Sequence, residues 1–366
     1  MSRPLQHGLS FLPDLRAGHD AAAADYFDLV LRLSVLADEA GLSHVKMTEH
    51  YLDPYGGYCP SPLAFCAAVA ARTSRVRLMT GCLLPAFHHP VQLAAETAMV
   101  DALSHGRLDV GVARAYLPYE FDALGVDLDT SRDRFDATVE AVTRLWSGRP
   151  CTEDTAFFTY EGAVSQPPPT QPGGPPLWVA AVMTPQSFVD AGQKGRGLLV
   201  TPSISPMTRM SELVASYRNA FVPARPGDRS RVLASLPLHV GPSDEAAHRI
   251  ADPRLQHYLD VWGAAARAWS TRSSRDYRGY TGMVRAIAAT TPASMRSVGG
   301  AVVGSAATVV ERIGELQDVL DVDGFLWQVD FGAVDPGTAR DGVDRFLADV
   351  LPHVQDAPSP REGAAS

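Results

Sequence analysis

The chain is poor in cysteine, with only four among 366 residues. Cys59, Cys66, Cys82 and Cys151 include no pair at zinc-site spacing and are too few for a disulfide scaffold, so we expect reduced thiols. Basic side chains are also in deficit, because 32 Lys and Arg stand against 41 Asp and Glu. The net charge of -9 argues against nucleic acid as the main partner, since phosphate binding needs a basic surface.

Long apolar runs are absent as well. No stretch is long enough to span a bilayer, and the N-terminal MSRPLQHGLS lacks the apolar core of a signal peptide. These absences predict a cytoplasmic protein without a membrane partner. No GxGxxG follows a predicted strand, so a nicotinamide site of the chain's own is not expected.

Short apolar runs alternate along the chain with stretches of helical period. Strands are predicted over 7–11, 43–48, 76–82, 107–113, 177–181, 197–201, 232–240 and 324–329. Helices are predicted over 25–40, 61–72, 90–103, 132–146, 184–194, 207–221, 306–319 and 336–350. An open doubly wound sheet rarely needs eight such units, whereas a closed barrel requires them. The predicted fold class is therefore α/β, a (β/α)8 TIM barrel with insertions.

Two regions interrupt the alternation. Residues 147–176 are dense in Pro and Gly, and their TAFFTYEG segment predicts a small hairpin outside the barrel. Residues 252–300 carry several aromatic and Arg residues, and they form either a lid or a helical subdomain packed on the side. We expect a single barrel domain over 1–354 and a disordered tail over 355–366.

In barrels of this kind the active site lies at the carboxyl ends of the strands, which limits the candidates. His50 follows the second predicted strand, and an imidazole suits acid–base chemistry near neutral pH. The alternative is a histidine that only hydrogen-bonds a loop. Glu49 beside it could orient His50 or a ligand, or pair with a lysine or arginine. Gly81, at the end of the third strand, allows a flat ligand to approach the backbone.

Several side chains point to an anionic group held at the barrel mouth. Arg114 ends the fourth strand and Arg132 begins a helix, where guanidinium groups suit a phosphate; ordinary ion pairs are the alternative. Thr184 and Ser187 stand at a helix start, where hydroxyls and free N–H groups bind anions, unless Thr184 is only the N-cap. The pair His88-His89 has no carboxylate at metal spacing, so we predict a helix entry and no metal site.

Four stretches resemble the bacterial luciferase-like flavin monooxygenases. They are EAGLSHVKMTEHY, TSRVRLMTGCLLPAFHHPVQLAAETAMVDALSHGRLDVGVARA, FDALGVDLDTSRDRFD and VVGSAATVVERIGELQDVLDVDGFLWQVDFG. The resemblance covers the chain from about Leu5 to Val354, and its specificity lies in the combination of EHY, HHP, the SHGR turn and SR. It implies the same barrel and reduced FMN as cofactor or, in one branch, the reduced deazaflavin coenzyme F420.

The resemblance also implies roles by position. His50 matches the family's catalytic histidine in the EH pair, and Glu49 is assigned to the cofactor site with it. Gly81 and Cys82 match the pair under the isoalloxazine ring, which a non-proline cis peptide often joins. Ala113 matches the residue near flavin carbon 4a; luciferase has a cysteine there, so light emission is not expected.

The phosphate end of the cofactor is assigned in the same way. Arg114 and Arg132 match the family's phosphate-binding arginines. Met183, Thr184 and Ser187 match the segment that wraps the phosphate, although Glu or Gly is common where Met183 stands. Tyr51 is a further departure, because the family often has a second histidine at this position.

The implied activity is that of a two-component monooxygenase. A separate flavin reductase would supply reduced FMN, dioxygen would be the oxidant, and a small organic substrate would receive one oxygen atom. The resemblance also implies a homodimer. Three alternatives stay open: a deazaflavin-dependent oxidoreductase that moves hydride without oxygen, a cofactor-free hydrolase with Glu49 and Glu120 as paired carboxylates, and a barrel that binds flavin without turnover.

Overall fold

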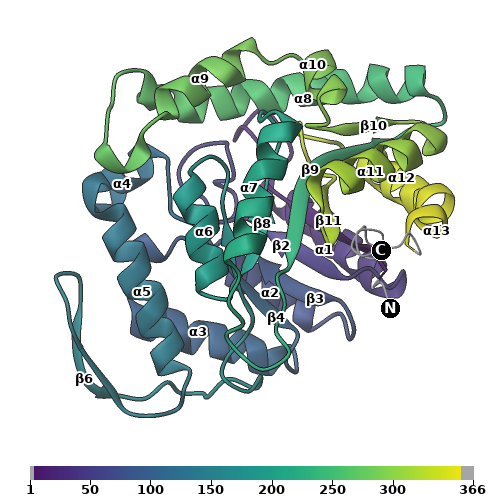
Figure 1. Cartoon of the computed structure of the whole chain (residues 1–366). Coiled ribbons are helices and arrows are strands. Elements are labelled where there is room, and N and C mark those ends of the chain that lie inside the picture. Colours follow the sequence, from purple (N-terminus) through teal and green to yellow (C-terminus); the bar gives the residue numbers. More distant parts are fainter. Residues whose placement is uncertain (1–3, 356–366) are drawn as a thin grey trace, which may run out of the picture.

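The computed structural model describes residues 4–355, and a closed barrel of parallel strands forms its centre (Figure 1). Neighbouring strands pair in the order β9, β11, β1, β2, β3, β4, β7 and β8, and a pairing of β8 with β9 closes the ring. These strands are β1 (Gln6–Phe11), β2 (His44–Met47), β3 (Arg77–Thr80), β4 (Leu108–Val112), β7 (Leu177–Ala180), β8 (Gly197–Val200), β9 (Val232–Val240) and β11 (Gly324–Gln328). The predicted eight-stranded barrel is confirmed, and each observed strand overlaps its predicted range. Apart from Gln355, the predicted tail lies outside the described residues.

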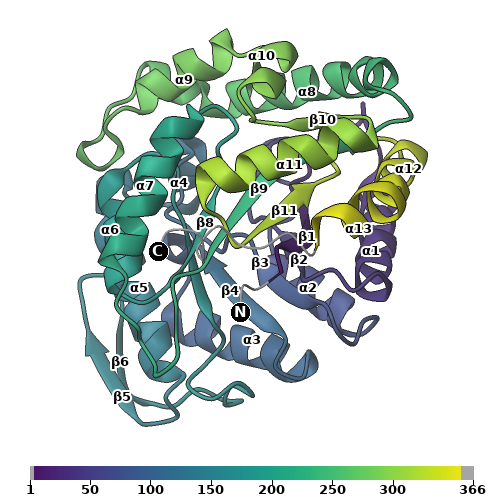
Figure 2. The ribbon, with the colours of Figure 1, turned by 45° about the vertical axis from the view of Figure 1, so that its right-hand side comes forward.

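Helices surround the barrel on its outer face (Figure 2). They are α1 (Ala23–Glu39), α2 (Pro62–Ala70), α3 (Pro90–Leu103), α5 (Ser131–Leu145), α6 (Pro185–Gln193), α7 (Met207–Ala220), α11 (Ala306–Leu320) and α12 (Pro336–Arg345), with a π-helical turn, η5 (Phe346–Val350), and α13 (Leu351–Val354) after the last. The helix predicted over 336–350 therefore begins as an α-helix and continues as a wider turn. His89 is the N-cap of α3, which confirms the predicted helix entry at this histidine.

The packing of α1 shows why the sequence predicts these helices. Its buried stripe includes Tyr26, Val30, Leu33 and Ala37, at the spacing that brings side chains to one face. Phe27, although apolar, is only partly buried. It follows Tyr26 directly and is rotated by about 100° around the axis, since a turn takes about 3.6 residues.

The remaining elements lie outside this repeat. The antiparallel pair β5 (Cys151–Asp154) and β6 (Thr159–Ala163) forms the predicted hairpin next to α5 (Figure 2). Short elements that the sequence did not reveal are α4 (Pro118–Leu124), β10 (Val302–Gly304), η1 (Pro85–Phe87), η2 (Leu128–Thr130), η3 (Arg267–Ser270) and η4 (Arg275–Tyr277). Each spans too few residues to show a period of its own.

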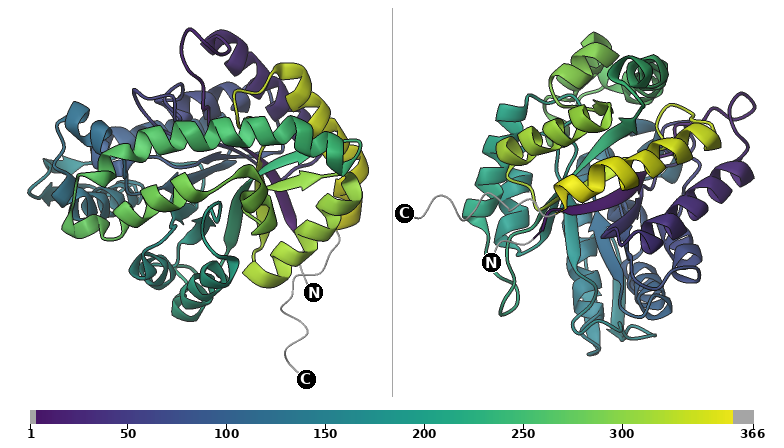
Figure 3. Two further views of the ribbon diagram at one scale, coloured as in Figure 1. Left: turned by 90° about the horizontal axis from the view of Figure 1, so that it is seen from above. Right: turned by 90° about the vertical axis from the view of Figure 1, so that its right-hand side faces the viewer.

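Three helices form a roof, residues 244–297, across the end of the barrel. They are α8 (Asp244–Ala266), α9 (Tyr280–Ala289) and α10 (Pro292–Ser297). Seen from above, α8 runs across the barrel (Figure 3, left). Its side chains Tyr258 and Trp262 are buried, and they help to line the cavity described below. Of the two expectations for this insertion, the lid over the mouth is thus the correct one, and the segment begins before the predicted residue 252.

Two buried histidines should make the stability of the fold depend on pH. Burial lowers the pKa of His7 and of His239 to about 4. In the unfolded chain these imidazoles have an ordinary pKa of about 6.5. Between about pH 6.5 and pH 4 the unfolded chain therefore binds more protons than the folded chain does. The contribution of the neutral imidazoles to the free energy of unfolding is complete above about pH 6.5. It is lost as the pH falls toward 4, by up to about 3 kcal/mol for each residue. Urea unfolding between pH 7.5 and pH 4.5 measures this loss.

His7→Phe should weaken this pH dependence, because it removes one titrating group while keeping a ring against Trp327. His353→Gln is the matched control, since His353 is exposed in α13. A pH dependence in His7→Phe as steep as in the parent would contradict the prediction.

Candidate active site

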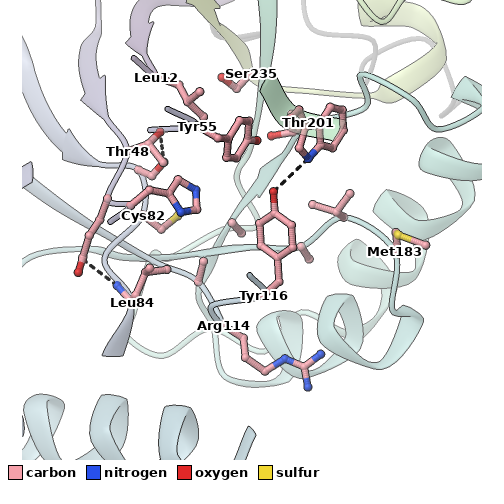
Figure 4. A pocket seen from close by; sticks show the side chains of 18 of the residues that line it. Leu12, Thr48, Tyr55, Cys82, Leu84, Arg114, Tyr116, Met183, Thr201 and Ser235 are labelled. Carbon is pink, nitrogen blue, oxygen red and sulfur yellow. Dashed lines mark hydrogen bonds between the residues drawn. The ribbon is translucent and has the colours of Figure 1, made fainter. Parts of the chain in front are cut away.

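A cavity of about 190 Å³ lies between the carboxyl ends of the strands and the roof (Figure 4). Four polar side chains of the strands form its floor: Ser10, Lys46, Ser235 and Gln328. Four side chains of α8 and α9 form its ceiling: Tyr258, Trp262, Tyr280 and Met283. The segments that follow β2, β3, β4 and β7 supply the walls.

Nine of the ten predicted site residues line this cavity. They are Glu49, His50, Gly81, Cys82, Ala113, Arg114, Met183, Thr184 and Ser187. The tenth, Arg132, borders a neighbouring space of about 50 Å³ that shares Arg114, Ala180 and Ser187 with the cavity. The residues therefore lie together as expected, while the role of each stays a prediction.

Positive charge gathers around this second space, which we call the basic space. Its border includes four basic side chains, Arg114, Arg132, Lys194 and Arg196. Two of them have acidic partners, because Lys194 Nζ lies 2.9 Å from Asp136 Oδ1 and Arg132 Nη1 lies 4.0 Å from Asp190 Oδ2. Arg196 is buried, and burial lowers the pKa of its guanidinium. The excess of positive charge suits a phosphate group.

Arg114 is the basic side chain that borders both spaces. Its Nη2 donates to the backbone oxygen of Asp276 at 2.8 Å, and its Cζ lies 4.2 Å from the centroid of the Tyr277 ring. Its Nη1 is buried and has no hydrogen-bond partner among the described residues. Figure 4 shows Arg114 on the opposite side of the cavity from Leu12 and Ser235. A buried guanidinium N–H without an acceptor is unfavourable, so this atom suits a bound oxyanion. The ordinary ion pair considered for Arg114 does not occur within residues 4–355.

The start of α6 faces the same region. Thr184 holds the N-cap position, but its side chain makes no capping hydrogen bond. The alternative in which the Thr184 hydroxyl serves only as a cap is therefore wrong. The hydroxyl lines the cavity next to a helix N-terminus, whose partial positive charge favours anions.

His50 is held in place by a carboxylate. Its Nδ1 lies 3.0 Å from Glu120 Oε1, and the same oxygen accepts the backbone N–H of Tyr51 at 3.0 Å. A carboxylate can only accept, so Nδ1 carries a proton and Nε2 is the atom left for chemistry. Both side chains are buried. This arrangement suits proton transfer by His50, with Glu120 as the group that orients it.

Glu49 is occupied by the protein itself. Its Oε2 accepts the backbone N–H of Leu84 at 3.0 Å, and its Oε1 bonds His88 Nε2 at 2.8 Å and the Tyr51 hydroxyl. Burial works against the charged form of His88, but the hydrogen bond and charge of Glu49 outweigh it and raise the pKa of the imidazole. The lysine or arginine partner considered for Glu49 is thus a histidine, and the carboxylate joins the two segments that follow β2 and β3.

Gly81 and Cys82 are joined by a cis peptide bond, as the resemblance implied. The structure adds a reason for glycine at this position, while the approach of a flat ligand stays a prediction. A Cβ at Gly81 would lie 2.2 Å from Cγ and Cε of Lys46, so the missing side chain makes room for this lysine. Burial raises the pKa of the Cys82 thiol to about 12, so it is neutral and no nucleophile.

Aromatic side chains close the cavity from above. The Trp262 indole N–H donates to the Tyr116 hydroxyl at 3.1 Å, as drawn in Figure 4, and the indole stacks on Tyr55 at 6.2 Å between centroids. Burial raises the pKa of Tyr116, Tyr258 and Tyr55, so their hydroxyls stay protonated donors. The ceiling is thus mainly apolar with a few polar groups, as small-molecule sites usually are.

Several residues of the site escaped the sequence analysis. Glu120 stood out only as a carboxylate, and its contact with His50 joins positions 70 apart in the chain. Lys46 interrupts the apolar strand HVKM, a signal that we overlooked. Lys194 and Arg196 follow α6 in QKGRG, where basic residues ordinarily end a helix. Within residues 4–355, no group of three or more His, Cys, Asp or Glu could hold a metal ion, and no helix has the length and apolar composition needed to cross a membrane.

Comparison with known proteins agrees with this geometry. The chain belongs to the luciferase-like monooxygenase family, whose sequence pattern matches residues 6–322. It is 27% identical over 345 residues to the oxygenase component of the flavin-dependent trigonelline monooxygenase of Acinetobacter baylyi, an alignment that covers 92% of each chain. Deazaflavin enzymes are also related, since the F420-dependent glucose-6-phosphate dehydrogenase of Beutenbergia cavernae is 32% identical over 195 residues, 51% of this chain and 56% of that one.

Solved structures show the same fold. Monooxygenase RslO1 from Streptomyces bottropensis matches with a TM-score of 0.80 and 33% identity over 95% of this chain and 99% of that one. The oxygenating constituent of 3,6-diketocamphane monooxygenase from Pseudomonas putida, solved with FMN, matches with a TM-score of 0.79 and 19% identity over 96% and 99%. The luciferase-like barrel is therefore established for this chain, and its relatives include flavin-dependent monooxygenases.

Proposed function

We propose that this chain is the oxygenase component of a two-component monooxygenase that uses reduced FMN and dioxygen to oxygenate a small organic substrate. The observation that carries the proposal is that the cavity and the basic space are neighbours and share Arg114 and Ser187 in their linings. A flat ring with a phosphate tail needs both an apolar chamber and an anion site. The unpaired Nη1 of Arg114 fits the same ligand.

Reduced FMN, when bound, supplies the electrons that activate dioxygen, so that one oxygen atom enters the substrate and the other leaves as water. The chain's own residues have simpler tasks. Arg114, Arg132 and Arg196 hold the phosphate, and Gly81 and Cys82 support the ring. His50 moves a proton through Nε2, in the tautomer that Glu120 selects.

The roof has the task of keeping water out. Ceiling side chains such as Trp262 and Tyr258 are buried, and they cover the cavity on the side away from the strands. Without such a cover the activated oxygen would be lost as hydrogen peroxide. The same side chains would contact the organic substrate, for which they offer aromatic surface and protonated hydroxyls.

A separate flavin reductase is part of the proposal. The relative from A. baylyi is by name an oxygenase component. This chain has no GxGxxG after a strand, so a nicotinamide site for reducing its own flavin is not evident. A homodimer and a cytoplasmic location stay predictions; Met99 and Leu103 of α3, which are 49% and 52% exposed, are apolar side chains that a dimer contact could cover.

The second candidate is a deazaflavin-dependent oxidoreductase, which the relationship to deazaflavin dehydrogenases favours. Basic residues that hold a phosphate serve either cofactor, so they do not separate the two. A cofactor-free hydrolase is disfavoured, because Glu49 and Glu120 each bond a histidine and do not form a pair. It would also leave the basic space without a use.

An anaerobic titration with photoreduced FMN, followed by rapid mixing with oxygen, tests the function. We expect tight binding and an absorbing species that outlives free reduced FMN in the same buffer. A substrate that is oxidised only when oxygen is present would then separate a monooxygenase from a hydride-transferring enzyme. If reduced FMN fails to bind while the reduced deazaflavin binds, the second candidate replaces the first, and failure of both would overturn the flavin assignment.

A further inference from the structure

A lysine lies in the floor of the cavity, inside the barrel. Lys46 is on β2 and only 7% exposed, and it lines the cavity. Its Nζ donates to Ser10 Oγ at 3.0 Å and to Ser235 Oγ at 3.4 Å. Neither hydroxyl carries charge, and within the described chain Nζ has no carboxylate partner at ion-pair distance. A buried cation without a counterion destabilises a fold, so its presence points to a charged ligand.

The sheet register places a second donor at the same level. Ser10 pairs with Lys46 on one side and with Gln328 on the other, so the three side chains neighbour one another across β2, β1 and β11. Gln328 is also buried and lines the cavity, and its Nε2 has no hydrogen-bond partner among residues 4–355. The floor therefore offers an ammonium and an amide to whatever lies above it.

The acidic groups around Lys46 do not neutralise it. Burial, and after it the charge of Asp14, raises the pKa of Asp330 to about 7, so this carboxyl is only partly ionised at neutral pH. Burial raises the pKa of Cys82 to about 12, so the thiol is neutral. Burial also lowers the pKa of the Lys46 ammonium, and an anion beside it would favour the charged form again.

Lys46 lies next to the place where the flavin ring is expected. Its side chain passes Gly81 so closely that a Cβ there would lie 2.2 Å from its Cγ. Gly81 and Cys82 are the pair expected under the ring, and Arg114 marks the phosphate end on the far side of the cavity. An orientation with the pyrimidine end of the ring toward the floor would bring N1 and O2 of the flavin next to Lys46 and Gln328. Reduced flavin carries a negative charge over N1 and O2, whereas the oxidised ring is neutral.

We propose that Lys46, with Gln328 beside it, binds the anionic N1–O2 edge of the reduced ring and so makes this chain prefer reduced over oxidised FMN. The inference rests on the proposed function. In this assignment the positive charge of Lys46 distinguishes reduced FMN from oxidised FMN. An oxygenase that receives its flavin already reduced needs this distinction.

The test compares the dissociation constants of oxidised and photoreduced FMN, the latter under anaerobic conditions, for the parent and for Lys46→Met. Methionine has a similar length without the charge. We expect the affinity for reduced FMN to fall about 10- to 100-fold, because a buried charge contact is lost, and the affinity for oxidised FMN to change less than about threefold. A tenfold change in this ratio lowers the two-electron potential of the bound flavin by about 30 mV. Lys46→Gln, which keeps a donor for Ser10, should show the same loss and serves if the methionine variant is unstable.

Ser235→Ala is the matched control, since it removes a neighbouring hydroxyl and keeps the charge. We expect its ratio to stay within about threefold of the parent. An unchanged ratio in both Lys46 variants, or an equal loss for both forms of FMN, would overturn the assignment while the proposed function stands. If the parent binds neither form, the proposed function fails and this inference with it.

Discussion

His50→Ala is expected to lower product formation about 10²- to 10⁴-fold, the range in which a positioned acid–base group contributes. Binding of reduced FMN should change less than about threefold, because the phosphate and the ring have their own contacts. The physical reason is the contact of Nδ1 with Glu120, which leaves Nε2 in the cavity as the atom that moves the proton. Single-turnover product yield at saturating reduced FMN, together with a separate binding titration, measures both quantities.

Two variants control this experiment. Glu120→Gln keeps a side chain of the same shape but weakens the orientation of His50, so we expect an intermediate loss and a shifted pH profile. Tyr51→Phe removes only the hydroxyl that bonds Glu49, and its backbone N–H still reaches Glu120. Its product yield should stay near that of the parent. Parent-level product formation by His50→Ala would show that the histidine has no part in the reaction.

Arg114→Gln is expected to weaken FMN binding about 100-fold, because it removes a partly buried charge from the basic space. Riboflavin, which lacks the phosphate, should bind the parent and the variant about equally. This pair of ligands separates a lost phosphate contact from a distorted cavity. The separation is necessary because Arg114 also donates to the backbone of Asp276.

Arg134→Gln is the matched control on α5. Its guanidinium lies over the Phe157 ring at 5.5 Å and does not border the basic space. Arg134 is half-buried, and we expect FMN binding to change less than about threefold in this variant because the lost charge lies outside the basic space. An equal loss of FMN and riboflavin affinity in Arg114→Gln would mean that Arg114 supports the wall of the cavity and does not bind the phosphate.

Lys46 and Arg114 have the same effect on the fold in the absence of a ligand, because each lowers its stability. Lys46 is a buried ammonium whose partners are uncharged hydroxyls, and Arg114 Nη1 is a buried donor without an acceptor among the described residues. A sequence selected for stability alone would replace them with apolar side chains. Lys46→Met should therefore unfold at a temperature at least as high as the parent, although it loses the preference for reduced FMN.

The sequence by itself determined the barrel, because local patterns encode it. Apolar runs of strand length alternate with helices whose apolar side chains recur at 3.6-residue spacing, as Tyr26, Val30 and Leu33 do. Strand ends are visible in the same pattern, and in a parallel barrel they all meet at one mouth. For this reason six of the nine cavity-lining residues could be placed together from the pattern, while the family resemblance implied the other three, Cys82, Ala113 and Met183.

Only the tertiary structure decided which groups interact there. The contact of Glu120 with His50 and the closure of the cavity by Trp262 join segments that no local pattern connects. Whether Lys46 points into the barrel depends on strand register, and a shift of one residue would turn it outward. The charge of the site, the orientation of its histidine and its cover against water are long-range properties, since each depends on side chains brought together by the closing of the barrel.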